Sequence, residues 1–237
     1  MEKAFIDLIL ENLYRPLYGL TVLVALIKYP KYYNTPLKLF PVIAMYTFLT
    51  ELLGYITKNY EVYDITIFSA FVAHNVIIYN IYNIIFFSFF FYVYWSYLTH
   101  PKYKRIILYG SIIFLVVTIA NVFLQSFILE SQIFSYLAGG LLILLSTILL
   151  FLERKKIQER QGFRFEGIKW ISIGLFIFYA GYLPIKVIRY HNYLYKINEY
   201  IHLRRIHLTL VCLLYICFIV GLLKMRRKFW ILSSKRN

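Results

Sequence analysis

Seven predominantly apolar stretches, joined by short polar connections, most constrain what this 237-residue chain can fold into. A helix that crosses the hydrocarbon core, about 30 Å thick, needs about 20 apolar residues at a rise of about 1.5 Å per residue. Each stretch is close to this length, and continuous apolar runs are typical of helices rather than of alternating barrel strands. The sequence therefore predicts one all-α domain over residues 1–237, a polytopic transmembrane bundle of seven helices. The predicted spans are 13–29, 37–57, 76–98, 106–127, 133–152, 168–188 and 206–225.

The composition excludes a soluble class of protein. Hydrophobic residues make up 61% of the chain and charged residues 16%, against about 45–50% and about 25% in an ordinary globular domain. The connections between spans are too short to hold a catalytic or DNA-binding domain. Cys212 and Cys217 both lie in the last predicted span, so we expect no disulfide framework, no metal site and no cofactor. The first residues include acidic side chains and no cleavage site, which predicts an uncleaved first helix.

The distribution of charge predicts an orientation. The net charge of +15 comes from 26 Lys and Arg residues against 11 acidic ones. When the basic residues are sorted by the two ends of the predicted spans, 18 flank one side and 8 the other. Lys and Arg gather on the cytoplasmic side of multi-pass proteins. We therefore expect a multi-pass protein of the cell (inner) membrane, with its N-terminus outside and its C-terminus in the cytoplasm. The expected partner is the lipid bilayer and not a nucleic acid.

Polar side chains within the predicted hydrocarbon segments are the candidates for a functional site. Glu51 lies well inside the second span, where a charged side chain costs at least about 2.5–3.5 kcal/mol on insertion scales. It must therefore be paired, hydrogen-bonded, protonated or in contact with water, and Asn80 or Asn83 is the expected hydrogen-bond donor. The polar residues at helical spacing on the second, third and fourth spans form either contacts between helices or a ligand-binding or titrating site. Besides Glu51 they are Thr47, Tyr79, Asn80, Asn83, Thr118, Asn121 and Gln125.

The connection between the sixth and seventh spans, residues 189–207, is unusually basic and aromatic for the outer side. Its apolar residues recur at helical spacing, which indicates a segment lying at the membrane interface. One interpretation is that its side chains anchor the seventh helix at the headgroups; the other is a vestibule for an anionic ligand or lipid headgroup. The spacing of its histidines does not match a metal motif. The candidate residues are Arg189, His191, Lys196, His202, Arg204, Arg205 and His207.

Three further segments carry expectations. Residues 65–73 are apolar but too short to cross the membrane, which predicts a re-entrant or interfacial piece. The polar loop 153–169 and the basic tail after Met225 predict a cytoplasmic docking face for anionic lipid or a soluble partner. Pro184 is expected to kink the sixth span.

Three sequence elements resemble small, uncharacterised seven-pass membrane proteins of Bacteroidetes-type bacteria. They are the segment Tyr-Tyr-Asn-Thr-Pro-Leu-Lys-Leu-Phe over residues 32–40, the element Glu-Leu-Leu-Gly-Tyr over 51–55, and Asn-Ile-Tyr-Asn over 80–83 within an aromatic third span. The resemblance covers about the first half of the chain. Similar proteins often lie beside sensor histidine kinases, so the resemblance implies a signalling role with a kinase as partner by association.

Three functions remain open from the sequence. The first is a membrane sensor or signalling accessory protein that binds a small or lipidic ligand within the bundle and acts through a cytoplasmic partner. The second is a small transporter or proton-coupled carrier that uses Glu51. The third is an intramembrane enzyme, which ranks last because no nucleophile–base pair and no catalytic residue can be recognised.

Overall fold

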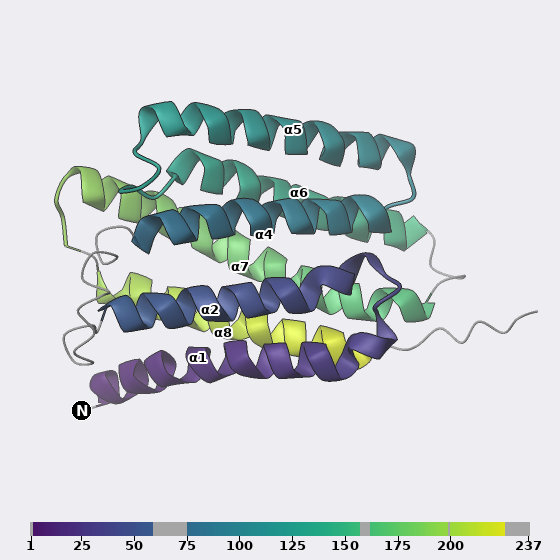
Figure 1. Cartoon of the computed structure of the whole chain (residues 1–237), viewed down its shortest axis with the longest axis horizontal. Helices are drawn as coiled ribbons and strands as arrows, with labels where there is room; N and C mark the ends of the chain where they lie inside the picture. The colour runs from purple at the N-terminus through teal and green to yellow at the C-terminus, as the bar shows by residue number, and fades with distance from the viewer. Residues whose placement is uncertain (1, 59–74, 157–161, 199, 226–237) are drawn as a thin grey trace, which may run out of the picture.

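The computed structural model describes residues 2–58, 75–156, 162–198 and 200–225. These residues form seven α-helices and no strand, which confirms the predicted all-α bundle. Consecutive helices run in opposite directions, so α1, α4, α6 and α8 all begin at one end of the molecule, which we call the N-terminal end (Figure 1). The helices are α1 (Glu2–Lys28), α2 (Phe40–Lys58), α4 (Asn75–Tyr97), α5 (Pro101–Leu124), α6 (Ile133–Lys156), α7 (Gly162–Leu194) and α8 (Ile201–Lys224), with 3-10 turns η1 (Tyr29–Lys31) and η2 (Pro36–Leu39) between α1 and α2.

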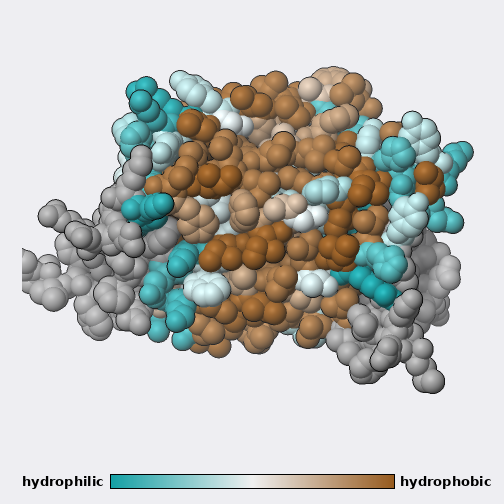
Figure 2. All heavy atoms as spheres, turned by 180° about the vertical axis from the view of Figure 1, so that it is seen from behind, coloured by the Kyte–Doolittle hydropathy of each residue, from teal (hydrophilic) through white to brown (hydrophobic). Residues whose placement is uncertain are grey.

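Six of the helices are long and apolar enough to cross a membrane: α2 together with η2, α4, α5, α6, α7 and α8. The surface agrees with this assignment, because on the face shown in Figure 2 hydrophobic side chains cover the middle of the molecule and hydrophilic side chains gather toward both ends. The chain is therefore a multi-pass helical membrane protein. Helix α1 has a similar length and lies in the same bundle, but its sequence includes Glu2, Lys3, Asp7, Glu11 and Arg15. Its crossing of the membrane stays a prediction.

Six helices form a closed ring, and the seventh lies outside it. Around the ring each helix packs against the next in the order α1, α2, α4, α6, α7 and α8, and α8 returns to α1. Helix α5 packs on the outer side, against α4 and α6. Its outward residues are exposed apolar side chains such as Ile113, Val116 and Phe123. In a membrane these side chains face lipid, so α5 supports the ring without closing it.

The end where α2, α5 and α7 begin is called the opposite end below. In the half of the bundle near this end, aromatic side chains fill the interior of the ring. Phe90 and Tyr94 of α4 are fully buried, and the Phe90 ring stacks on Phe218 of α8 with the centroids 6.1 Å apart. The Tyr94 hydroxyl lies 2.7 Å from the Thr147 hydroxyl and donates to the Ser172 hydroxyl at 3.1 Å. The buried aromatic residues of α4 past Phe86 therefore belong to a packed core with its own polar contacts; they are Phe87, Phe89, Phe90, Phe91 and Tyr94.

Glycines set the distance between α7 and α8. Gly167, Gly174 and Gly181 recur every seven residues on α7, and each approaches α8. A Cβ atom added at Gly174 would lie 2.6 Å from the Cβ of Cys217, closer than two such carbons can come. Small residues at such positions let helix backbones pack closely in a membrane. The two helices that close the ring are therefore held in a fixed register.

Several helix boundaries differ from the predicted spans because helices here continue past the hydrocarbon. Helix α7 passes through Pro184 and ends only at Leu194, and α8 begins at Ile201, so the predicted loop 189–207 is mostly helical. The end of α7 is fixed by Lys196, which has a φ of 52°, and by the bond from the Ile197 backbone N–H to the Asn192 carbonyl (2.8 Å), a glycine-type helix stop.

The loop predicted over 153–169 is likewise shorter, because α6 continues to Lys156 and α7 begins at Gly162. The predicted re-entrant piece over 65–73 and the basic tail after Met225 lie outside the described residues.

Candidate functional site

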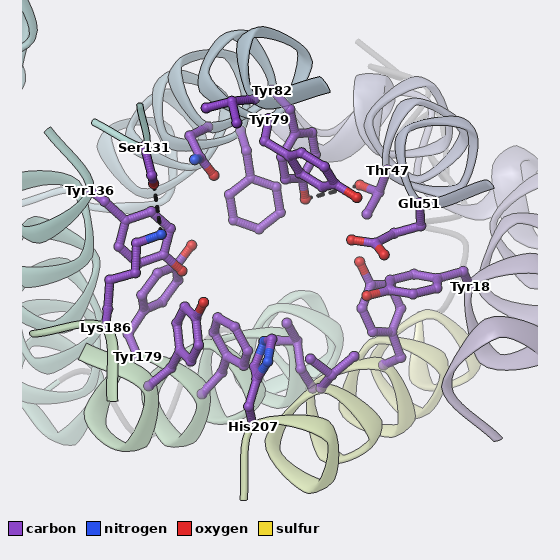
Figure 3. Close-up of a pocket in the computed structure, with 18 residues that line it drawn as sticks. Tyr18, Thr47, Glu51, Tyr79, Tyr82, Ser131, Tyr136, Tyr179, Lys186 and His207 are labelled. Carbon is purple, nitrogen blue, oxygen red and sulfur yellow. Dashed lines mark hydrogen bonds between the residues drawn. The ribbon is translucent and has the colours of Figure 1, made fainter. Parts of the chain in front are cut away.

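The ring encloses a cavity of about 290 Å³ in the half near the N-terminal end (Figure 3). Every helix of the ring contributes to its wall, as does Ser131 from the connection between α5 and α6. The lining residues on α4 run from Val76 to Phe86, so the cavity extends along about 15 Å of that helix at about 1.5 Å per residue. The polar lining residues are Thr47, Glu51, Asn83, Ser131, Lys186, His207 and seven tyrosines: Tyr18, Tyr79, Tyr82, Tyr136, Tyr179, Tyr182 and Tyr215.

An aromatic layer closes the inner end of the cavity. Phe86 lines the cavity and contacts Phe90, with the ring centroids 4.8 Å apart, and Phe90 in turn stacks on Phe218. All three side chains are buried. The cavity therefore occupies one half of the bundle and ends against the packed half.

The tyrosines make the wall of the cavity polar without making it charged. Tyr18 and Tyr215 pack edge to face with their centroids 4.2 Å apart, and Tyr82 lies with its hydroxyl 3.1 Å from the Thr47 hydroxyl. A tyrosine offers an apolar ring and one hydroxyl that donates and accepts. A ligand in this cavity would meet aromatic faces and hydroxyl groups on most sides.

Glu51 supplies the negative charge of the cavity. Its carboxylate points into the open space from α2, beside Tyr18 (Figure 3). It makes no side-chain hydrogen bond to another residue that the structure describes. The guanidinium of Arg15 attracts it electrostatically, but this group lies over the Tyr55 ring at 3.9 Å and does not line the cavity. The carboxylate is therefore presented to whatever occupies the cavity.

Positive charge lies on the other wall. The Lys186 ammonium donates to the Ser131 hydroxyl at 2.8 Å and lies 5.3 Å from the centre of the Tyr136 ring. The His207 ring stacks on Tyr182 at 4.3 Å, and its Nδ1 lies 3.3 Å from the Arg189 guanidinium. In the close-up, Glu51 and Lys186 extend from opposite walls (Figure 3).

A second cavity of about 280 Å³ lies next to the first and shares Val76, Ser131 and Lys186 with it. Its other lining residues include Leu129 and Tyr193, which are 59% and 65% exposed. Lys186 therefore stands between the inner cavity and a second, partly exposed cavity near the N-terminal end, beside the connection between α5 and α6.

The structure separates the predicted polar residues into two groups. Thr47, Glu51, Tyr79 and Asn83 line the inner cavity. Asn80 does not donate to Glu51 as expected: its amide donates to the carbonyl oxygens of Phe127 and Glu130. The predicted network around Glu51 is corrected on this point, because Asn80 faces the connection between α5 and α6.

The predicted polar residues of the fourth span do not line the inner cavity, and two of them join α5 to the start of α6. The Asn121 amide donates to the Ser135 hydroxyl (3.3 Å), and the Gln125 side-chain oxygen accepts from the Ile133 backbone N–H (3.1 Å). The Thr118 hydroxyl donates to a carbonyl of its own helix. Asn121 and Gln125 therefore hold the outer helix against α6.

The residues of the predicted basic loop are also divided. His207 lines the cavity and Arg189 contacts it from behind. His191 is exposed and lies against Tyr195, and Lys196 is exposed at the end of α7. His202, Arg204 and Arg205 lie on the first turns of α8 and do not line either cavity.

Sequence reasoning missed Lys186 and most of the tyrosines. Lys186 lies two residues before the end of the predicted sixth span and was counted only as a flanking charge. Tyr179 and Tyr215 lie at the middle of their spans, where an interfacial anchor has no role, and this position is the signal that could have identified them. Glu153 was also missed: it is 5% exposed, and its carboxylate accepts from the backbone N–H groups of Thr99 (2.8 Å) and His100 (3.2 Å) at the start of α5.

No protein-family model, no curated protein and no solved structure matches this chain. Within the described residues, no group of three or more His, Cys, Asp and Glu side chains could hold a metal ion.

Proposed function

We propose that this protein is an integral membrane sensor, or signalling accessory protein, that binds a small or lipidic ligand in the inner cavity. One observation carries the proposal: a polar cavity surrounded by six helices lies in one half of the bundle and ends against the aromatic layer of Phe86, Phe90 and Phe218. Ligand sites in proteins are concave, mostly apolar and provided with a few convergent polar groups. Glu51 and Lys186 are such groups.

The closed inner end favours binding over transport. A carrier has to offer its site to both sides of the membrane in turn. In this structure the half beyond Phe86 is filled by buried residues, including Phe90, Tyr94 and Leu175. Close packing of this kind does not deform gradually and resists opening. The site therefore has the character of a pocket reached from one end.

The helices that line the cavity also offer a route to the opposite end. α7 and α8 both contribute to the cavity wall, and they pack backbone to backbone at Gly167 and Gly221 near the other end. Because the glycine contacts hold α7 and α8 together, a ligand that favours one position of this pair relative to the rest of the ring shifts the population of that position along both helices. A partner bound at the opposite end would respond to this change in population. The resemblance above gives a histidine kinase as the expected class of partner.

The positive-inside rule supports an orientation for this scheme. The opposite end presents Lys102, Arg105, Lys155, Lys169 and Lys224, all exposed. Placing this end in the cytoplasm of an inner-membrane protein puts the cavity in the outer half, where an external ligand reaches it, and puts the partner on the inner side.

Cysteine labelling tests the proposal. In a Cys212→Ala/Cys217→Ala background, Val211→Cys places a thiol on the cavity wall and Leu175→Cys places one in the packed half. A membrane-impermeant cationic methanethiosulfonate is added to right-side-out and to inside-out vesicles. We expect Val211→Cys to react from the outside only and Leu175→Cys to react from neither side. Reaction of Val211→Cys from both sides would support a carrier, and reaction from neither side would refute an accessible pocket.

A further inference from the structure

Opposite charges extend into the inner cavity from separate walls. Glu51 comes from α2 and Lys186 from α7, and neither forms an ion pair with another residue in the described part of the chain. Among the described residues, the Lys186 ammonium donates to a neutral hydroxyl, that of Ser131, and lies over the Tyr136 ring. Glu51 and Lys186 are both half-buried, so a charge contact with either of them is screened less than it would be in bulk water. A ligand that carries complementary charges at its two ends could make both of these contacts.

The surface between the two charges suits an organic cation and an apolar body. Tyr18 and Tyr79 flank the Glu51 side of the cavity, and the faces of tyrosine rings attract an ammonium group. Phe86, Phe178 and Leu214 add apolar side chains to the cavity wall. On the Lys186 side, the ammonium and the Ser131 hydroxyl provide donors for an anionic group.

The volume limits the ligand to a small molecule or a headgroup. A cavity of about 150 Å³ holds one benzene molecule, with six heavy atoms. The inner cavity, at about 290 Å³, is about twice as large. It therefore fits about a dozen heavy atoms.

We propose that the inner cavity binds a zwitterion of about this size, with its ammonium group at Glu51 and its carboxylate or phosphate group at Lys186. This inference rests on the proposed ligand-binding function and names its ligand class. The same chemistry occurs in a free amino-acid-like compound and in the headgroup of phosphatidylethanolamine. The second cavity, which Leu129, Glu130 and Tyr193 line and which shares Lys186 with the inner cavity, is the route by which a lipid headgroup would reach the site.

Three matched probes test the charge pairing in the wild-type protein. 4-(Aminomethyl)benzoate carries both charges on one rigid ring, benzylamine keeps only the ammonium, and 4-methylbenzoate keeps only the carboxylate. Binding is measured by calorimetry on the full chain in phosphatidylglycerol nanodiscs. We expect the zwitterion to bind at least about tenfold more tightly than either single-charge probe, because one added charge contact of about 1.4 kcal/mol corresponds to this factor. Equal affinities, or no binding of any probe at millimolar concentration, would overturn the inference.

Two variants assign the charges to their residues. Glu51→Gln should weaken the zwitterion and benzylamine but not 4-methylbenzoate, and Lys186→Met should weaken the zwitterion and 4-methylbenzoate but not benzylamine. Lys169→Met, which removes an exposed lysine of α7 near the opposite end, is the matched control and should change none of the affinities. Lys186→Arg keeps the charge and should keep 4-methylbenzoate binding if Lys186→Met does not fold. Zwitterion affinity that survives both substitutions would overturn the assignment.

Two further experiments distinguish a lipid headgroup from a free zwitterion, and a failure of the charge inference from a failure of the ligand-binding proposal. If phosphatidylethanolamine added to the nanodiscs competes with the zwitterion, the headgroup is the source; if it does not, a free zwitterion is the source, and both results support the shared chemistry. If neutral 4-methylbenzyl alcohol binds as tightly as the zwitterion, the charge inference is wrong while ligand binding stands. One-sided labelling of Val211→Cys tests the proposed function independently of any of these probes.

Discussion

Replacing Asn80 by alanine should loosen the connection between α5 and α6 and destabilise the bundle. The Asn80 side chain is 2% exposed and reaches this connection from α4. Its amide donates to the carbonyl oxygens of Phe127 (2.8 Å) and Glu130 (2.9 Å), and its Oδ1 accepts from the Gln132 backbone N–H (3.2 Å). Alanine leaves all three backbone groups without this partner.

The expected loss of stability follows from these three hydrogen bonds. Side-chain hydrogen bonds within membrane bundles contribute about 0.6 kcal/mol on average and at most about 1.7 kcal/mol, so three of them correspond to about 2–5 kcal/mol. The neighbouring Ser126 and Ile128 are exposed, so solvent at the end of the bundle can satisfy part of the loss. We therefore expect the free energy of unfolding to fall by about 2–3 kcal/mol.

Unfolding by SDS in mixed micelles, followed by tryptophan fluorescence, measures this change. Asn83→Ala is the matched control: Asn83 lies one turn further along α4, lines the cavity and makes no side-chain hydrogen bond to a described residue. It should lose less than about 1 kcal/mol. Asn80→Asp keeps the size of the side chain but turns an oxygen toward the Phe127 and Glu130 carbonyls, and should be at least as damaging as alanine.

A second measurement localises the effect. Glu-C protease cleaves after Glu130, and the loosened connection should be cut faster in Asn80→Ala than in the wild type. If Asn80→Ala unfolds at the same SDS fraction as Asn83→Ala and is cut no faster than the wild type, Asn80 does not hold this connection and the reasoning is wrong.

Three further substitutions follow from the packing, each measured by the same SDS titration. Glu153→Ala should cost about 1–3 kcal/mol, because it removes the acceptor for the Thr99 N–H at the start of α5; a stability equal to wild type would count against that cap. Gly174→Ala should cost about 1–3 kcal/mol, because its Cβ would lie 2.6 Å from the nearest atom of α8. Gly19→Ala, whose Cβ would meet nothing closer than 3.7 Å, is its control and should be tolerated. Tyr94→Phe should cost about 1–2 kcal/mol through its two hydroxyl contacts on α6 and α7, and an unchanged midpoint would show that these contacts contribute nothing.

The helices could be predicted from the sequence because a bilayer demands long apolar runs. The residues at which the helices end could not be predicted in this way. Apolarity marks the part of a helix that lies in hydrocarbon, whereas the helix itself stops where its backbone is capped. α7 therefore continues six residues past Ile188, to the stop at Lys196. Glu153 was missed for the same reason, since it lies just past the predicted end of the fifth span.

The candidate site could be predicted only in part, because the sequence gives the faces of helices but not their neighbours. Glu51 was identified from its cost in hydrocarbon, and it does line a cavity. The partner expected for it, Asn80, turns to the connection between α5 and α6 because α5 lies outside the ring. Lys186 joins the site from the far side of the ring, and no spacing rule relates two residues on helices that meet only across a cavity.

The aromatic layer of Phe86, Phe90 and Phe218 also determines where the membrane voltage falls. If the cavity is connected to the solution at the N-terminal end, as proposed above, and fills with water and ions, its interior stays close to the potential of that solution, and the voltage drops mainly across this layer and the packed half behind it. A unit charge that crosses 100 mV gains or loses about 2.3 kcal/mol, but a charged group that stops beside Glu51 passes through only a small part of that field. For a charged ligand of the class proposed above, occupancy of the cavity would therefore follow the ligand concentration and change little when the membrane depolarises.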